Sequence, residues 1–183
     1  MNLFLRLLVT FIRASLSREK PGFLDTTRIR SRVMLTDQDM FAHMTNSRYF
    51  SFSDLAVINY IVRTGAWPKL RRKGWFPVVA AETVVFASML RAHQAFEVTT
   101  RLVGWTDTFI CIEHRFLRDG TETARVRLIA RFASRKNERV SVDQVRDLHG
   151  ITEASPPLDE AFLALLADVE SARARRREAV KPR

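Results

Sequence analysis

The stretch Asp37-Gln38-Asp39-Met40-Phe41-Ala42-His43-Met44-Thr45-Asn46-Ser47-Arg48-Tyr49 lies between a strand-like run that ends near Thr36 and a helix-like run that begins near Ser47. It places two acids, a histidine and an asparagine at a strand-to-helix junction. The first turn of a helix offers N–H groups that have no partner within the helix and can therefore face a ligand. A carboxylate just before such donors is typical of a site that attacks an acyl carbon and holds the resulting oxyanion.

The same residue types also suit a loop with a purely structural role. Asp and Asn are common in turns and at helix caps, so an Asp-x-Asp loop followed by Asn-Ser could simply start a helix. A short motif of this kind is a hypothesis whose structural context has to be checked. The residues alone therefore leave a catalytic and a structural interpretation open.

The run Asp-x-Asp-x-x-Ala-His-Met-x-Asn-Ser-x-Tyr resembles the Asp-x-Asp-x-x-Gly-His-(Val/Met)-Asn-Asn-(Ala/Ser)-x-Tyr signature of hotdog-fold acyl-CoA thioesterases, in the branch related to 4-hydroxybenzoyl-CoA thioesterase. The stretches 63–65, 74–78 and 96–105 are also similar to that branch. The likeness extends from Arg28 to Val140 and is strongest to small bacterial proteins that also resemble vertebrate thioesterase superfamily member six. It implies an α+β hotdog fold, in which a curled antiparallel sheet wraps around one long central helix.

Hydrophobic periodicity predicts the same order of elements. The run Thr26 to Leu35 predicts a strand, and Ser47 to Thr64 predicts a helix that is apolar on most sides, hence buried, and ends at Gly65 in a left-handed conformation. Alternation of apolar and polar residues then predicts four strands, over 76–89, 96–105, 109–117 and 123–133. One strand, a long helix and four consecutive strands are the α+β order that a hotdog requires.

We divide the chain into three parts. Residues 1–22 form an amphipathic N-terminal helix and a linker, 23–140 the hotdog domain, and 141–183 a C-terminal helix and a basic tail that we expect to be frayed. The segment 67–74 is predicted to be a basic connector. In the third part, Ser155 is the expected N-cap of the helix and Pro156 its first residue.

The N-terminal helix carries an apolar stripe, and Arg6 and Arg13 are predicted to lie on its polar side. Its apolar stretches are too short to span a bilayer, and Arg6 interrupts the run that a signal peptide would need. One interpretation is an interfacial helix whose arginines reach anionic headgroups. The alternative is a helix that packs on its own domain or on a second subunit. The residues of the stripe are Leu3, Phe4, Leu7, Leu8, Phe11 and Ile12.

Composition narrows the class of protein. The 183 residues suit one domain with a full core. The single cysteine, Cys111, excludes an intrachain disulfide and fits a cytoplasmic protein. We also consider a peripheral location of this protein at the inner membrane surface. The formal charge of +10 implies an affinity for something anionic, such as a membrane, nucleic acid or coenzyme A. Because no recognition motif accompanies the charge, we do not expect nucleic-acid binding.

The resemblance assigns roles to individual residues of the motif. Asp39 aligns with the catalytic carboxylate of the family, as nucleophile toward the thioester or as base for a water. The backbone N–H of Asn46 would polarise the thioester carbonyl, although Asn46 could equally be a plain N-cap. His43 would orient Asp39 or the substrate, or brace the loop, and Asp37 suits a bracing role. Ala42 replaces the glycine of the signature. Because alanine lacks the conformational freedom of glycine, position 42 is where the loop geometry of the family is least expected to apply to this chain.

We expect Tyr49, Arg91, Arg125 and Arg127 to bind substrate, the arginines through the phosphates of coenzyme A. No cofactor is needed, and the scattered histidines give no metal-ligand spacing. Because hotdog sites form between subunits, the resemblance implies a homodimer or a dimer of dimers. The predicted function is hydrolysis of an acyl-CoA thioester to the free acid and CoA; the alternative is a non-catalytic hotdog domain that binds acyl chains or anionic membranes.

Overall fold

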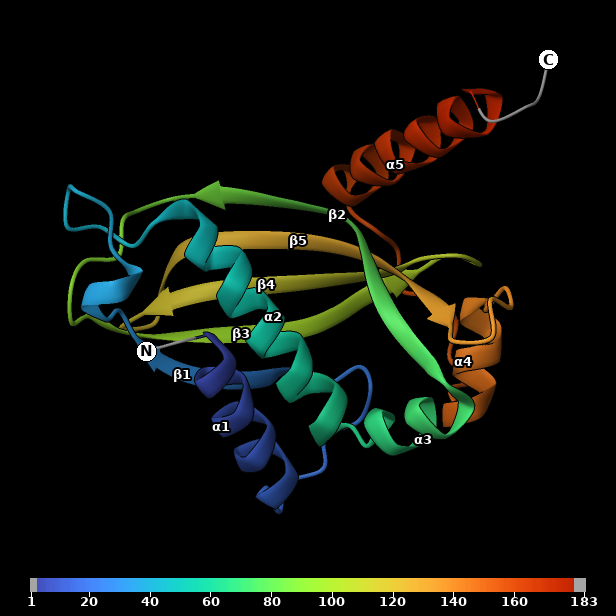
Figure 1. Ribbon diagram of the computed structural model, residues 1–183, viewed down its shortest axis with the longest axis horizontal. Coiled ribbons are helices and arrows are strands. Elements are labelled where there is room, and N and C mark those ends of the chain that lie inside the picture. The colour runs from blue at the N-terminus through green and yellow to red at the C-terminus, as the bar shows by residue number, and fades with distance from the viewer. Residues whose placement is uncertain (1–2, 180–183) are drawn as a thin grey trace.

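The computed structural model describes residues 3–179 and contains a five-stranded antiparallel sheet crossed on one face by a long helix. The strand order is β1-β3-β4-β5-β2, and Figure 1 shows α2 lying across the curled sheet. The predicted α+β hotdog architecture is therefore confirmed. The strands are β1 (Thr27–Arg32), β2 (Trp75–Phe86), β3 (Ala95–Trp105), β4 (Ile110–Arg118) and β5 (Thr121–Ser134). The α-helices are α1 (Leu3–Leu16), α2 (Asn46–Arg63), α3 (Ala66–Lys73), α4 (Val142–His149) and α5 (Glu160–Ala179).

Strands β3, β4 and β5 form a meander whose alternation separates two faces. Val98 pairs with Phe116, and Phe116 pairs with Ala124, so these three buried residues share the face that α2 covers. The turn between β4 and β5 uses Asp119 and Gly120, both at positive φ, which is the geometry of a two-residue hairpin loop. The period-two pattern of the sequence thus predicts the faces correctly.

Helix α2 is the centre of the core because its apolar residues occupy most of its circumference. Phe52 meets Phe96 edge to face at 4.9 Å, and Tyr49 lies 4.9 Å from the rings of both Phe86 and Phe116. Gly65, with φ of +73°, follows the end of the helix as predicted. These contacts pack the first turns of α2 against side chains of β2, β3 and β4.

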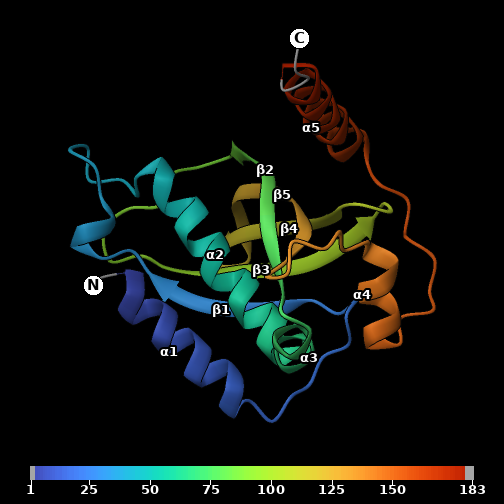
Figure 2. The same ribbon diagram turned by 45° about the vertical axis from the view of Figure 1, so that its right-hand side comes forward.

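The opposite face of the sheet carries charged side chains and the beginning of α5. Phe162, Leu166 and Val169 of α5 pack on Phe109 and Cys111, while the rest of the helix projects away from the sheet (Figure 2). The buried Cys111 is a core residue, as predicted, and burial raises the pKa of its thiol to about 12. The beginning of α5 therefore covers only the part of this face around Phe109 and Cys111.

Several predictions about the helices are wrong. The supposed connector 67–74 is helix α3, and α4 lies in a region where no helix was expected. The cap of α5 is Asp159, whose Oδ1 accepts the N–H of Phe162 at 2.8 Å, rather than Ser155, whose Oγ accepts the N–H of Trp105 at 2.8 Å. The arginines 173–177 are helical instead of frayed, and residues 180–183 lie outside the described part of the chain.

Helix α1 docks on α2, which was one of the two alternatives (Figures 1 and 2). The predicted orientation is wrong, because Arg6 is buried and ion-paired with Asp37 at 2.6 Å instead of facing outward. Leu7 packs against the core, and Phe11 meets Trp67 of α3 edge to face at 6.1 Å. The side of α1 that contacts the domain therefore carries Arg6 together with the apolar residues Leu7 and Phe11, while Arg13 is exposed.

Strand β2 forms one edge of the sheet and exposes apolar side chains along its length. It pairs with β5, and no described strand lies on its other side. Its only charged residue is Glu82, while Phe76, Val79, Val85 and Phe86 are 40–58% exposed. A long, apolar edge is prone to pairing with another strand. The opposite edge, β1, is protected by Arg28, Arg30 and Arg32.

We expect the protein to form dimers through β2. Replacing Val79 and Val85 together by lysine should convert the dimer to a monomer, because two charges would be placed along the paired edge. Light scattering at micromolar concentration measures the molar mass. Leu163→Lys on the exposed side of α5 is the matched control and should leave the dimer intact. A monomeric parent protein would contradict the expectation directly.

Candidate functional site

The loop between β1 and α2 is a compact structure held by its own backbone. Gln38 and Met44 form an antiparallel bridge, and the N–H of Asp39 donates to the carbonyl of His43 at 2.9 Å. Ala42 stands at the turn with φ of +60°, a left-handed conformation in which alanine is strained relative to glycine. The loop therefore keeps the conformation in which the family signature places glycine, although alanine occupies the position.

Asp39 is exposed at the surface of this loop. Its Oδ1 accepts the N–H of Phe41 at 2.9 Å and the N–H of His43 at 3.1 Å. These two bonds orient the carboxylate and also brace the loop. The exposed side chains of Met40 and Phe41, 90% and 70% accessible, lie beside it. The candidate nucleophile is thus held in a fixed orientation on an open, apolar rim.

Helix α2 begins directly after this loop, as the motif predicts. Thr45 is the N-cap and accepts no side-chain cap bond, and Asn46 is the first helical residue, so the interpretation of Asn46 as the N-cap is wrong. Asn46 and Ser47 are exposed, so the N–H groups of the first turn are accessible to a ligand. Asp39 and these donors therefore stand at the same open end of α2.

Asp37 has a structural environment that the sequence did not reveal. Its side chain is completely buried, and Oδ2 accepts a bond from Arg6 of α1 at 2.6 Å and from the N–H of Met34 at 3.0 Å. Oδ1 lies 3.3 Å from Nε of Arg48 on α2. Its carbonyl also accepts the N–H of Thr45 at 2.9 Å. Asp37 therefore joins α1, the loop and α2, which agrees with the predicted bracing role.

Arg91 and Tyr49 both lie close to the loop, but Arg91 is exposed and Tyr49 is buried. Arg91 is exposed and forms a bridge with His43, and the N–H of Met44 donates to the carbonyl of Leu90 at 2.7 Å. The structure thus brings Arg91 next to the site. Tyr49 is only 2% exposed and packs in the core, where burial raises the pKa of its hydroxyl. Within a single chain, Tyr49 packs the start of α2 against the core rather than facing the loop.

Arg125 and Arg127 are not brought to the loop. Both lie on the face of the sheet opposite α2, where Arg125 binds Glu122 at 3.0 Å and Arg127 binds Asp159 at 3.3 Å. The hydrogen bond to Glu122 raises the pKa of Arg125. Within a single chain these two arginines stabilise the outer face, and a role in binding substrate stays a prediction.

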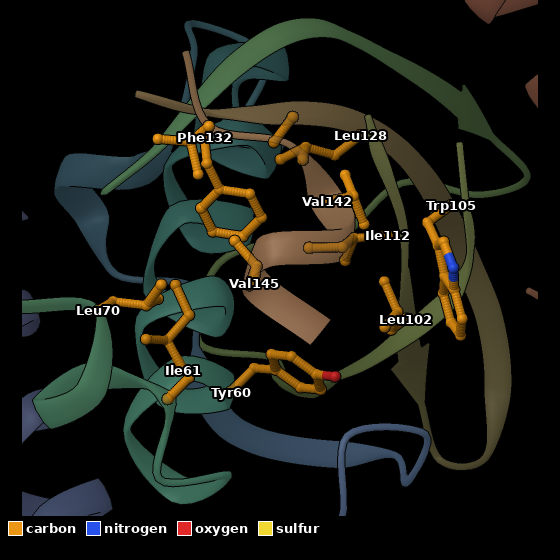
Figure 3. Packing of buried hydrophobic residues seen from close by; sticks show 13 residues of the cluster. Tyr60, Ile61, Leu70, Leu102, Trp105, Ile112, Leu128, Phe132, Val142 and Val145 are labelled. Carbon is orange, nitrogen blue, oxygen red and sulfur yellow. The ribbon is translucent and has the colours of Figure 1, made fainter. Parts of the chain in front are cut away.

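A large apolar cavity lies between the second half of α2 and the inner face of the sheet. Its volume is about 370 Å³, and Figure 3 shows hydrophobic side chains converging around it. Asp54 of α2 and Val79 of β2 line it and are exposed, so the cavity reaches the surface between α2 and the edge strand. Its other walls come from the sheet, α3 and α4, including Leu70, Leu102, Ile112, Leu128, Val142 and Val145.

An acidic pair stands between α2 and β2. Burial, together with the charge of Asp54, raises the pKa of Glu82 to about 7. The nearby hydroxyl of Ser53, which is fully buried, acts in the opposite direction and lowers this pKa. His114, fully buried on the inner face, has its pKa lowered to about 3 by burial and holds its Nδ1 2.9 Å from Oγ1 of Thr100. An isolated Glu in an apolar strand was the only sign of this pair in the sequence.

Two proteins from other organisms have sequences similar to this chain. The chain is 28% identical over 117 residues to Protein THEM6 of Drosophila melanogaster and 32% identical over 114 residues to Protein THEM6 of Xenopus laevis. These matches cover 63% and 58% of this chain. The chain spans 61% and 55% of the length of the two relatives, which is less than two thirds of each.

Solved structures with the same fold include two CoA thioesterases. The gentisyl-coenzyme A thioesterase matches with a TM-score of 0.60 and 18% identity, over 66% of this chain and 99% of that one. The DHNA-CoA thioesterase of Staphylococcus aureus matches with a TM-score of 0.61 and 12% identity, over 69% and 87%. The family model described as the thioesterase-like superfamily matches residues 33–166, which include the loop, α2 and all of β2 to β5. The chain therefore belongs to the thioesterase-like superfamily.

Proposed function

We propose that the protein hydrolyses the thioester of an acyl-CoA, releasing the free acid and CoA. The observation that carries this proposal is the exposed carboxylate of Asp39 on the loop that leads directly into the open N-terminus of α2. Asp39 acts as nucleophile on the thioester carbon or as base for a water, and the first N–H groups of α2 stabilise the oxyanion. The backbone N–H of His43 helps to hold Asp39 in place by donating to Oδ1.

Three further observations support a CoA ester as substrate. The exposed guanidinium of Arg91 next to the loop suits a phosphate, since arginine pairs with phosphate in a planar, bidentate geometry. The solved structures with this fold include proteins named for gentisyl-CoA and DHNA-CoA. The charge of +10 favours an anionic substrate in general.

The apolar cavity suits the acyl group. Because an apolar cavity of about 150 Å³ binds one benzene, a cavity of about 370 Å³ has room for roughly 12 to 15 carbon atoms. Asp54, which lines it, lies eight residues into α2 from Asn46, or roughly 12 Å along the helix axis. A substrate that uses both the loop and the cavity therefore has an extended aliphatic chain.

Hydrolysis of a panel from acetyl-CoA to long-chain acyl-CoA tests this assignment. We expect kcat/KM to rise with chain length. Ala130→Leu places extra carbons in the cavity and should lower kcat/KM for decanoyl-CoA by roughly 10- to 200-fold, with little change for acetyl-CoA. Ala161→Leu on exposed α5 is the matched control. An equal loss for both substrates would show that the cavity does not hold the acyl chain.

A non-catalytic role is the second candidate, because Asp39 already accepts two N–H groups of its own loop. Such bonds are what a purely structural turn residue makes. In that case the protein would bind acyl-CoA without turnover. Binding of decanoyl-CoA with no release of free CoA from any member of the panel would favour this second function.

A further inference from the structure

Helix α1 differs from an ordinary surface helix because it carries large apolar residues on its outward side. A surface helix buries its apolar stripe against the domain and leaves charged residues in water. In α1 the buried positions are Arg6 and Ala14, and Leu7 and Phe11 also pack on the domain. The outward side instead carries large apolar residues at a helical spacing. These are Leu5, Leu8, Ile12 and Leu16, which are 46%, 45%, 46% and 77% exposed, and we call them the α1 stripe.

The Arg6–Asp37 ion pair explains this orientation. The side chain of Arg6 is 7% exposed, and its guanidinium lies 2.6 Å from a fully buried carboxylate and 5.0 Å over the ring of Phe52. Rolling α1 to bury its leucines would pull Arg6 away and leave Asp37 buried with Arg48 as its remaining cation, at 3.3 Å. Leaving a buried charge without its partner is strongly unfavourable. The ion pair therefore keeps the α1 stripe facing outward.

The surroundings of the α1 stripe are basic. The sequence has no acidic residue before Glu19, and the carboxylate of Glu19 binds Arg63. Arg13 and Arg18 are exposed. The contact of Phe11 with Trp67 places the start of α3 beside α1, and the exposed residues of α3 include Lys69, Arg71, Arg72 and Lys73. Trp67 itself is 38% exposed, and tryptophan is favoured at membrane interfaces.

We propose that the α1 stripe, with the basic residues around it, docks the protein on the surface of an anionic membrane. An apolar helix face with basic flanks is the composition of an interfacial helix. A docking surface for an ordinary protein partner would not need so uniform a positive charge, whereas an acidic lipid surface is its complement. Within residues 3–179, no helix combines the length and the hydropathy that a membrane crossing would require. The proposed contact is peripheral.

The consequence for the site is direct. Arg6, on the buried side of α1, holds Asp37, and Asp39 lies two residues further on the same loop. A protein docked through the α1 stripe would keep this loop at a fixed height above the lipid. Long-chain acyl-CoA partitions into that layer, so docking would raise the local supply of such a substrate.

Co-sedimentation of the full chain with phosphatidylcholine vesicles, with and without phosphatidylglycerol, tests the proposal. We expect binding to the anionic vesicles that declines with added salt, because the screening length falls from ~10 Å at 0.1 M to ~3 Å at 1 M. Leu8→Asp/Ile12→Asp should weaken it by roughly 100-fold or more, since two apolar side chains no longer enter the interface. Arg13→Glu should weaken it by at least roughly fivefold.

Leu163→Asp on α5, a residue that is 54% exposed, is the matched control and should bind like the parent chain. Thermal unfolding verifies that Leu8→Asp/Ile12→Asp folds, and unchanged melting is expected because both side chains are outward. The proposal is overturned if the parent chain binds neither vesicle, or if the double variant binds as the parent does. If the parent chain binds neither vesicle and Leu8→Asp/Ile12→Asp lowers the molar mass in light scattering, the α1 stripe joins two copies of the chain instead of binding lipid.

Discussion

Replacing Asp39 by asparagine should lower kcat for the best acyl-CoA substrate by about 10²–10⁴-fold, the range for loss of a positioned acid or base. Asparagine is nearly isosteric, and its Oδ1 can still accept the N–H groups of Phe41 and His43. The loop should therefore keep its shape, and the melting temperature should hardly change. Only the carboxylate charge is removed, which makes this substitution a test of chemistry rather than of folding.

The matched control for this experiment is Asp25→Asn. Asp25 is also an exposed loop carboxylate that accepts a backbone N–H of its own turn, from Gly22 at 2.8 Å, but it lies before β1 and away from the start of α2. We expect kcat to be unchanged in this variant. If Asp39→Asn hydrolysed acyl-CoA as fast as the parent chain, the carboxylate would be a loop brace and the catalytic group would lie elsewhere.

Substituting Asp37 by alanine should reduce the free energy of unfolding by about 3–5 kcal/mol, because the guanidinium of Arg6 would stay buried without its carboxylate. For a chain of this length that loss corresponds to a decrease in melting temperature of roughly 6–20 °C. The substitution also removes the acceptor for the N–H of Met34. Urea denaturation followed by circular dichroism measures the change.

Two other variants are compared with Asp37→Ala for their loss of stability. Arg6→Met leaves Asp37 with Arg48 at 3.3 Å, so the loss should be smaller than for Asp37→Ala. Glu19→Ala removes an exposed partner of Arg63 and should change stability little, since surface ion pairs contribute little. The role of the buried pair would be disproved if Asp37→Ala and Glu19→Ala unfolded at the same urea concentration.

The sequence predicted the sheet and the central helix well because each has a strong periodic signal. Alternation in 96–105 and 123–133 matches β3 and β5 closely, and the apolar circumference of 47–64 matches α2. The failures concern short or strongly charged helices. Only Leu70 and Ala66 of α3 are buried, so its pattern is too sparse to separate a helix from a basic loop. Ser155 has the right residue type for a cap, but tertiary contact with Trp105 uses its hydroxyl.

The site was predictable only as far as local sequence reaches. The motif located Asp39, His43 and the start of α2 because these residues are close together in the chain. The partners of Asp37 were not predictable, since Arg6 lies 31 residues away and its burial depends on how α1 docks. In the same way, no local pattern indicates that Arg125 and Arg127 face away from α2 and bind acids of β5 and the segment before α5.

The strand order has a consequence for how the chain is made. Both outer strands leave the ribosome before the strands that they pair with: β1 precedes its neighbour β3, and β2 precedes its neighbour β5. The β3-β4-β5 meander is the local part of the sheet and can form by short-range pairing, whereas the outer strands require long-range pairing, which is slow. Helix α2, apolar on most sides, is synthesised before any of these three strands. Until β5 is complete at Ser134, nascent chains therefore carry an α2 that the sheet does not yet cover, and exposed apolar surface of this kind is aggregation-prone and calls for chaperones.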